Sequence, residues 1–204
     1  MPFRIDDFRA SLRFDGARAS LFDVAMIIPT SVNSTLVARE LTFKARAASL
    51  PGDTVSSISV NYFGREIKVA GTHSFPDYTL TIINDEDFIL RNAFENWMSQ
   101  INRHVDNTRN PNFAQALQYQ TNLQIRQYNK VGPSSGGLAA ASKIYNLVGA
   151  FPTDVSPIDL DWGSDTIEEF TVTFAYQWWE SNTTDASNGT AGAQQVPIGL
   201  VGAG

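Results

Sequence analysis

Between residues 64 and 104 the hydrophobic pattern of the chain changes from the period of a β-strand to the period of an α-helix. Residues 78–83 are β-branched or apolar on both faces, which predicts an interior strand. Residues 84–104 then repeat apolar side chains at spacings of three and four, which predicts an amphipathic helix that covers a sheet. The apolar stripe of this helix consists of Leu90, Ala93, Phe94, Trp97, Met98 and Ile101.

The start of this helix is predicted at Asn84, whose side chain can cap the first turn. Asp87, three residues later, can reach back to the cap, and the acidic run of residues 85–87 suits the positive end of the helix dipole. We interpret Trp97 as part of the helix surface that covers the sheet and not as part of a ligand site.

A hairpin is predicted immediately before the interior strand. Apolar side chains alternate over residues 58–62 and 65–70, and Gly64 between them indicates a turn. We expect Gly71 to end the second strand. On a protruding arm the apolar side chains would face solvent, so we expect this hairpin to contact other copies of the chain. The predicted contact residues are Tyr62, Arg65, Ile67, Lys68 and Val69.

Further alternating segments complete a mainly β pattern. They are residues 22–28, 41–47, 117–126, 143–151 and 170–178. We expect Pro152 to end the fourth of these strands and the fifth, which has the longest alternation, to be central. About seven strands and one helix predict two packed antiparallel sheets, as a sandwich or a partly closed barrel, with the hairpin extending as an arm.

The composition fits one globular domain. The chain has 204 residues, of which 43% are hydrophobic and 18% are charged. We expect a single domain over residues 1–180, in which residues 1–18 form an N-terminal arm. Residues 181–204 are rich in Ser, Asn and Gly, and we expect a C-terminal tail with too little apolar surface to fold alone.

Little in the sequence points to catalysis. The chain has no cysteine and two histidines, and no nucleophile motif or phosphate-binding glycine loop is present. We therefore expect no catalytic residues, no metal site, no cofactor and no enzyme activity. No stretch approaches the eighteen apolar residues of a membrane span, so none is expected.

The net charge of −6 argues against tight binding of nucleic acid. Fifteen basic residues oppose twenty-one acidic ones, whereas a grip on phosphates requires an excess of Lys and Arg.

Three segments in this order resemble the tail tube proteins of contractile-tailed bacteriophages. They read RAASLPGDTVSSISVNYFGREIKVAG, FPDYTLTIINDEDFILRNAFENW and LDWGSDTIEEFTVTFAYQWWE, and the resemblance covers about residues 43–180. This chain departs from the compact family pattern in the polar insert around residues 108–118, in the GPSSGG turn and after residue 180.

The resemblance implies a structural subunit of the virion tail, assembled in the host cytoplasm. It implies hexameric rings that stack into a hollow conduit for DNA ejection into the host. The implied partners are other copies of the chain, the tail sheath, the baseplate, the tail terminator, a tape-measure protein in the lumen and DNA that passes without tight binding. The hairpin would then act between subunits or between rings.

In such a tube the amide face of the segment 117–126 is expected to line the lumen or to face solvent, because uncharged polar groups hydrate well without holding phosphate. A subunit seam is the alternative. The residues concerned are Gln118, Gln120, Asn122 and Gln124.

Two other functions stay open at this stage. A tube subunit of a type VI secretion system or another contractile injection system belongs to the same physical class. A carbohydrate-binding β-sandwich is a different class, and the aromatic side chains of Trp162, Trp178 and Trp179 are the feature that would favour it.

Overall fold

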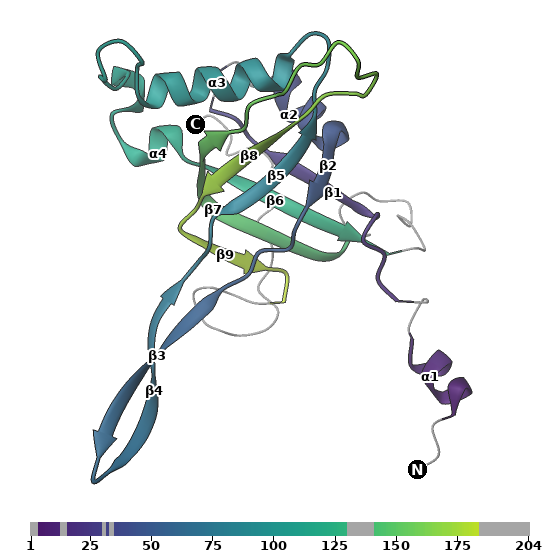
Figure 1. The fold of residues 1–204 in the computed structure, drawn as a ribbon, viewed down its shortest axis with the longest axis vertical. Coiled ribbons are helices and arrows are strands. Elements are labelled where there is room, and N and C mark those ends of the chain that lie inside the picture. Colours follow the sequence, from purple (N-terminus) through teal and green to yellow (C-terminus); the bar gives the residue numbers. More distant parts are fainter. Residues whose placement is uncertain (1–3, 13–15, 30–31, 33–34, 130–140, 184–204) are drawn as a thin grey trace, which may run out of the picture.

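The computed structural model describes residues 4–12, 16–29, 32, 35–129 and 141–183. Figure 1 shows a β-sheet body with a hairpin arm extending from one end and a helix lying across the other. The helices are α1 (Ile5–Ser11), α2 (Thr35–Lys44), α3 (Ile89–Ile101), the 3₁₀ turn η3 (Pro111–Phe113) and α4 (Ala116–Tyr119). The strands are β1 (Phe22–Met26), β2 (Ala45–Ala48), β3 (Thr54–Tyr62), β4 (Arg65–Ser74), β5 (Tyr78–Ile83), β6 (Thr121–Tyr128), β7 (Ala141–Val155), β8 (Glu169–Ala175) and β9 (Trp178–Ser181).

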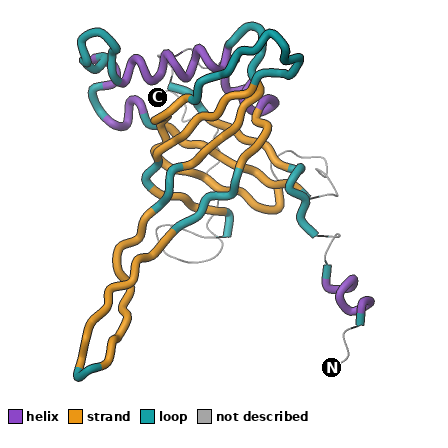
Figure 2. Tube along the Cα trace, in the orientation of Figure 1, coloured by secondary structure: helices purple, strands orange, loops and turns teal. Residues whose placement is uncertain are grey.

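The body is a seven-stranded antiparallel sheet. Its strand order is β1-β6-β7-β8-β5-β2, and β9 pairs with β7 beside this path. Strand β7 joins the two halves, because residues 141–150 pair with β6 while residues 151–155 pair with β8. Strands β3 and β4 form a separate two-stranded sheet, the arm, which is clearly visible in Figure 2. The predicted mainly β fold with an amphipathic helix and a hairpin arm is confirmed.

One apolar core lies between the two halves of the sheet and the helices. It includes Leu80 and Phe174 from one half and Leu123 and Ile125 from the other. The alternation in β8 explains this, because Phe170, Val172 and Phe174 are buried while the residues between them are partly exposed. Strand β8 lies between β7 and β5, so its predicted interior position is also confirmed.

Helix α3 buries four of the six residues of the predicted apolar stripe, whereas Met98 and Ile101 are partly buried. Phe94 and Trp97 are fully buried, and the Phe94 ring meets the Phe174 ring edge-on with 5.8 Å between centroids. The Trp97 indole Nε1 donates to the carbonyl oxygen of Tyr119 at 3.0 Å, which satisfies its one polar group inside the core. The structure therefore places Trp97 in the core, as predicted.

The predicted start of this helix is wrong. The helix begins at Ile89 after Phe88, and the Asn84 side chain instead donates to Glu168 Oε2 at 2.8 Å. Asp85 forms an ion pair with Lys44 and lies before the first turn of the helix. These polar groups are used to join the segment before α3 to other parts of the chain, so they are not available as caps.

The strand predicted over residues 41–47 is half wrong, because residues 41–44 are the last turn of α2. The buried side chains Val37 and Leu41 lie four positions apart, a helical spacing, and the Thr42 hydroxyl donates back to the Ala38 carbonyl at 3.1 Å. Only residues 45–48 form a strand.

Several strand ends also differ from prediction. Strand β4 continues through Gly71 to Ser74, and β7 continues through Pro152 to Val155. Pro152 is tolerated because the pairing with β8 shifts register between Pro152 and Asp154. The predicted strand 117–126 begins with the short helix α4, and the long C-terminal alternation divides into β8 and β9.

The N-terminal segment contains the short helix α1, which was not predicted. Figure 1 shows it away from the sheet, and none of its residues is buried. The GPSSGG turn, and the predicted C-terminal tail beyond residue 183, lie outside the described residues.

Candidate functional site

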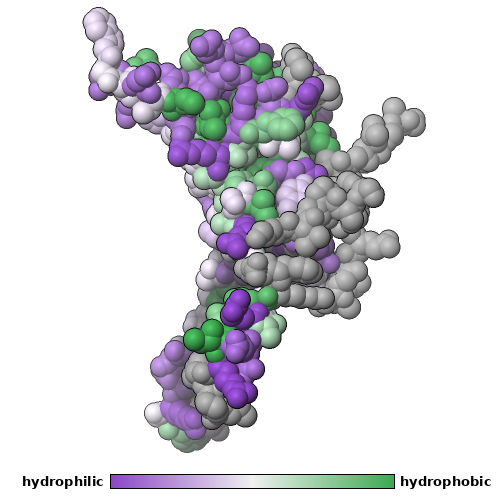
Figure 3. All heavy atoms as spheres, turned by 90° about the vertical axis from the view of Figure 1, so that its right-hand side faces the viewer, coloured by the Kyte–Doolittle hydropathy of each residue, from purple (hydrophilic) through white to green (hydrophobic). Residues whose placement is uncertain are grey.

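The arm is a two-stranded ribbon with no cover on either side among the described residues. Every residue of β3 is exposed, and only Gly71 in β4 is partly buried. Figure 3 looks from the side of α1 and shows green apolar and purple polar atoms side by side in the part of the molecule below the body. Two strands alone are marginal in water, so this ribbon is a feature of the chain that needs a partner surface.

One face of the arm is apolar. Val60 lies directly opposite Ile67, and Ile58 lies opposite Val69, so these four side chains point to the same side of the ribbon. Each is about half exposed, from 49% to 54%. The tip end of this face is formed by the cross-strand pair of Tyr62 and Arg65.

The opposite face of the arm is polar. It carries Ser57, Ser59 and Asn61 on β3, with Glu66 and Lys68 on β4. The hydroxyl of Ser59 donates to the Glu66 carboxylate across the strands. The arm is thus amphipathic, and its apolar face is the one that gains most from a second molecule.

The tip is a two-residue turn of a type that suits a twisted hairpin. Phe63 and Gly64 both have positive φ, of 47° and 78°, which fits a turn with two left-handed residues. Glycine adopts this conformation easily, whereas phenylalanine does so only under constraint. The Phe63 ring is 92% exposed and meets the Tyr62 ring edge-on at 4.6 Å between centroids. Phe63 is not among the predicted contact residues, although its position before the turn glycine places it at the tip.

A bulge at the base of the arm depends on Gly71. The pairing of β3 and β4 shifts register between Val55 and Ser57. A Cβ on Gly71 would lie 2.5 Å from Ser56 Oγ and 3.1 Å from the Ser56 carbonyl oxygen. Glycine therefore lets the two strands come close here, and bulges of this kind bend a ribbon and increase its twist.

Contacts between the flanking ends of the two strands and a contact with the body hold the base of the arm. His73 Nε2 lies 2.9 Å from the Asp53 carboxylate, and the His73 ring lies 4.6 Å from the Phe75 ring. Trp179 of β9 donates from Nε1 to the Gly52 carbonyl oxygen at 3.2 Å. The base of the ribbon is thus fixed to the sheet while its outer part is free.

The structure brings four of the five predicted contact residues together. Tyr62, Arg65, Ile67 and Val69 lie on the apolar face, while Lys68 pairs with Ser59 on the polar face. Their role in contacts between copies stays a prediction.

The four predicted amide residues do not form one exposed face. Gln118 belongs to helix α4 and Asn122 to strand β6, and both are exposed, whereas Gln124 is only 2% exposed. The expected strand with a continuous amide face is therefore wrong, because the chain is helical up to Tyr119. A lumen or solvent role for Gln118, Gln120 and Asn122 stays a prediction.

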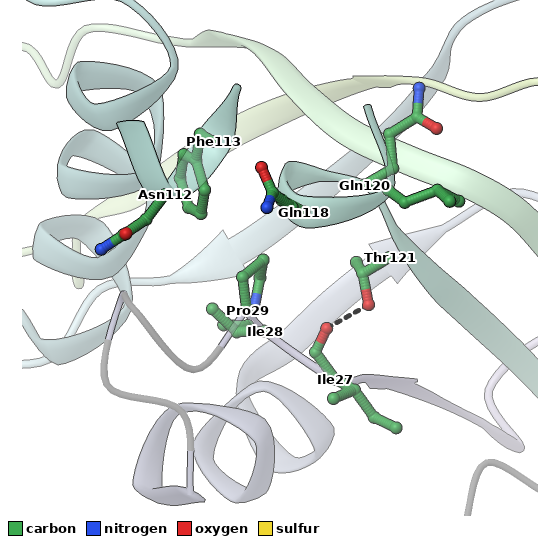
Figure 4. A pocket seen from close by; sticks show the side chains of 9 residues that line it. Ile27, Ile28, Pro29, Asn112, Phe113, Gln118, Gln120 and Thr121 are labelled. Carbon is green, nitrogen blue, oxygen red and sulfur yellow. Dashed lines mark hydrogen bonds between the residues drawn. The ribbon is translucent and has the colours of Figure 1, made fainter. Parts of the chain in front are cut away.

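Gln118 and Gln120 line an open groove that the sequence did not reveal. The groove has a volume of about 590 Å³ and runs between α4, η3 and the end of β1. Figure 4 shows Phe113, Gln118 and Pro29 around it, and the Thr121 hydroxyl donates to the Ile27 carbonyl at its edge. The lining mixes apolar and amide groups without a charged side chain, which suits contact with protein and offers no acid, base or nucleophile.

The three tryptophans considered for carbohydrate binding do not gather in one place. Trp162 lies in the loop between β7 and β8, at the end of the body opposite β9 (Figure 1), whereas Trp178 and Trp179 belong to β9. Trp179 packs against Tyr145 with 5.3 Å between ring centroids. A shared aromatic platform is therefore absent from the described part of the chain.

Across the described ranges no group of three His, Asp or Glu side chains lies together as a metal site would require. In the same residues no helix has the length and apolarity to span a bilayer.

Known proteins with a similar sequence belong to one family. The family model described as phage tail tube protein matches residues 17–182. Tail tube protein gp19 of Enterobacteria phage T4 is 30% identical over 178 residues, which are 86% of this chain and 99% of the relative. This near-complete match favours a phage tail over the type VI alternative.

Two solved structures share the fold. A chain in the six-fold symmetrised anti-feeding prophage baseplate has 16% identity and a TM-score of 0.55, with 81% of this chain and 94% of that chain covered. A chain in the sheath–tube complex of the extracellular contractile injection system PVC has 14% identity and a TM-score of 0.54, with coverage of 88% and 98%.

Proposed function

The chain belongs to the phage tail tube protein family, and from this premise we propose that its copies close into hexameric rings that stack into a hollow conduit for DNA. It is a structural subunit of the tail tube and a component of the virion tail. In the proposed arrangement the arm of each copy reaches a neighbouring ring. A contact between two different surfaces of the same molecule produces a closed ring when the rotation between neighbouring copies adds up to a full turn. When the rotation does not close, the contact repeats along an axis.

The observation that carries this proposal is the uncovered apolar face of the arm. Ile58, Val60, Ile67 and Val69 expose about half of their surface on a ribbon that is otherwise anchored only at its base. Burying this surface in a neighbouring copy would stabilise the contact by about 25 cal/mol for each Å² of apolar area.

The tube is proposed to work without catalysis and with the partners of a contractile tail. The sheath would surround it, the baseplate and tail terminator would lie at its ends, and a tape-measure protein would occupy its lumen before DNA passes. Support comes from the solved chains of the same fold, one of which lies in a sheath–tube complex and another in a six-fold symmetrised baseplate.

The arm can be tested with charge placed on one face at a time. Ile67→Asp with Val69→Asp puts two carboxylates on the apolar face, where burial without a partner costs several kcal/mol for each copy. We expect a folded protein by circular dichroism that no longer sediments as tubes.

Ser57→Asp is the control, because it adds a carboxylate to the polar face of the same ribbon, away from the tip. We expect this variant to keep most of the assembly. Equal loss of tubes in both variants would show that charge on the arm, and not its apolar face, decides assembly. Loss of the fold in the first variant would show that these residues belong to the core.

A further inference from the structure

The loop of residues 156–168, between β7 and β8, exposes large apolar side chains. Trp162 is completely exposed, Leu160 is 79% exposed and Ile167 is 74% exposed. A loop in a monomeric protein gains nothing from three such side chains in water, and a group of this kind marks a contact surface. Figure 1 shows this loop at the end of the body opposite the tip of the arm.

The same loop is acidic and carries no basic residue. Asp159, Asp161 and Asp165 are all exposed and take part in no ion pair within the described chain. The segment before α3 lies beside the loop, because the Asn84 backbone N–H donates to the Glu168 carbonyl at 2.8 Å. It adds the exposed acids Glu86 and Asp87 to the same end of the molecule.

The tip of the arm has the complementary chemistry. Arg65 and Lys68 are exposed and belong to no ion pair of the described residues, while Glu66 accepts a hydrogen bond from Ser59. Beside them Tyr62 and Phe63 present two aromatic rings that are 64% and 92% exposed. The tip therefore combines cations with aromatic surface, and the loop combines carboxylates with aromatic and aliphatic surface.

We infer that the tip of the arm of one copy docks on the loop of residues 156–168 of a second copy in the neighbouring ring. The inference rests on the stacked rings proposed above and names the surface that receives the arm. The two surfaces lie at opposite ends of one chain, so the contact joins copies head to tail and repeats without limit along an axis.

The chemistry of the two surfaces fixes how they meet. The Trp162 indole offers a face on which the Arg65 guanidinium or the Phe63 ring can stack. Asp159 and Asp165 belong to the same loop, and their carboxylates would attract Arg65 and Lys68 and repel an acidic surface. Because both charge groups are exposed before contact, stacking is expected to weaken as the salt concentration rises.

Charge reversal tests the pairing. Arg65→Glu with Lys68→Glu on the arm is expected to abolish tubes, and Asp159→Lys with Asp165→Lys on the loop is expected to do the same. Combining the four substitutions restores opposite charges, so tubes are expected to return to at least half of the wild-type amount by sedimentation. Tubes that persist in both double variants, or a combined variant no better than either one, would overturn the inference.

Cross-linking locates the contact, since the chain has no cysteine of its own. Glu66→Cys near the tip and Ser164→Cys on the loop are prepared as separate proteins, mixed, assembled and treated with a short bismaleimide. Val105→Cys replaces Ser164→Cys as the control, because Val105 is fully exposed in the loop after α3 at the same end of the molecule.

We expect a dimer from Glu66→Cys with Ser164→Cys that is at least ten times more abundant than with Val105→Cys. Tubes that form but link Glu66→Cys to Val105→Cys equally well or better would overturn this inference and leave the stacked rings intact. The absence of rings and tubes in the wild-type protein would overturn both.

Discussion

The carboxylate of Asp23 in strand β1 accepts hydrogen bonds from two side chains of strand β6. Arg126 donates from Nε and Nη2 to its two oxygens at 2.7 and 2.6 Å, and the Tyr128 hydroxyl donates to Oδ2 at 2.9 Å. Asp23 and Arg126 are direct cross-strand partners, so a bidentate pair between them fixes the register of the two strands. Burial and then the hydrogen bond to Asp23 raise the pKa of Tyr128.

Replacing Asp23 by Ala leaves the Arg126 guanidinium without its partner at a site where its side chain is only 17% exposed. We expect Asp23→Ala to lower the free energy of unfolding by about 1–3 kcal/mol, measured by urea denaturation. Glu95→Ala is the control, because the Glu95 side chain is 51% exposed and its partner Arg91 keeps a second acceptor in the Ser156 carbonyl oxygen. The loss of Glu95 is expected to change stability by about 0.5 kcal/mol or less. Equal effects of the two substitutions would contradict a structural role for Asp23.

At the scale of elements, the sequence predicted those whose period matches one buried face. Strands β1, β5 and β8 and helix α3 follow their alternation or stripe, because burial on one side selects the residue type at each position. The arm was predicted for the same reason. Its apolar face alternates like a core face although none of the described residues covers it, which is the pattern expected of a face that a second copy would cover.

The wrong predictions occur where a local pattern fits more than one structure or where a polar group has a partner far away in the sequence. Residues 41–44 fit a strand by alternation, yet Leu41 is buried four positions after Val37 and the segment is helical. Asn84 is a good cap by type, but its partner is Glu168, a residue far away in sequence. Sequence period cannot identify such partners, and it also missed the groove at Gln118 because three separate segments form it.

Gly71 permits a prediction about the arm as an element. Gly71→Ala brings a Cβ to 2.5 Å from Ser56 Oγ and 3.1 Å from a backbone oxygen, so the bulge must open. We expect faster hydrogen exchange of the amides of β3 and β4 and fewer stacked rings, with the exchange of β5 and β8 unchanged. Gly52→Ala is the control, because a Cβ there has nothing within 4 Å. Unchanged exchange in the arm of Gly71→Ala would show that the bulge tolerates a side chain.

At the scale of the whole molecule, the net charge of −6 is consistent with a conduit that releases its cargo. Three cations that could have held DNA, Lys44, Arg46 and Arg126, each form an ion pair within the chain. Their partners are Glu40 and Asp85 for Lys44, Glu169 for Arg46 and Asp23 for Arg126. A cation already paired with a carboxylate gains less from a phosphate, and each phosphate neutralised along a stack would slow passage.

We therefore expect assembled tubes to retain no duplex DNA in a gel-shift assay, even at low salt where any phosphate contact is strongest. Asp23→Ala with Glu169→Ala frees Arg126 and Arg46, and this variant is expected to bind DNA more than the wild-type tube if those cations face the lumen. Salt-sensitive binding by the wild-type tube would contradict a lumen that releases DNA.

Negative-stain electron microscopy of the purified protein over a range of concentrations shows whether copies of this chain build a tube. We expect six-fold rings at low concentration and stacked tubes at high concentration, because the arm and the loop of residues 156–168 that we propose receives it lie at opposite ends of each copy. A particle that stays monomeric at every concentration would contradict the account.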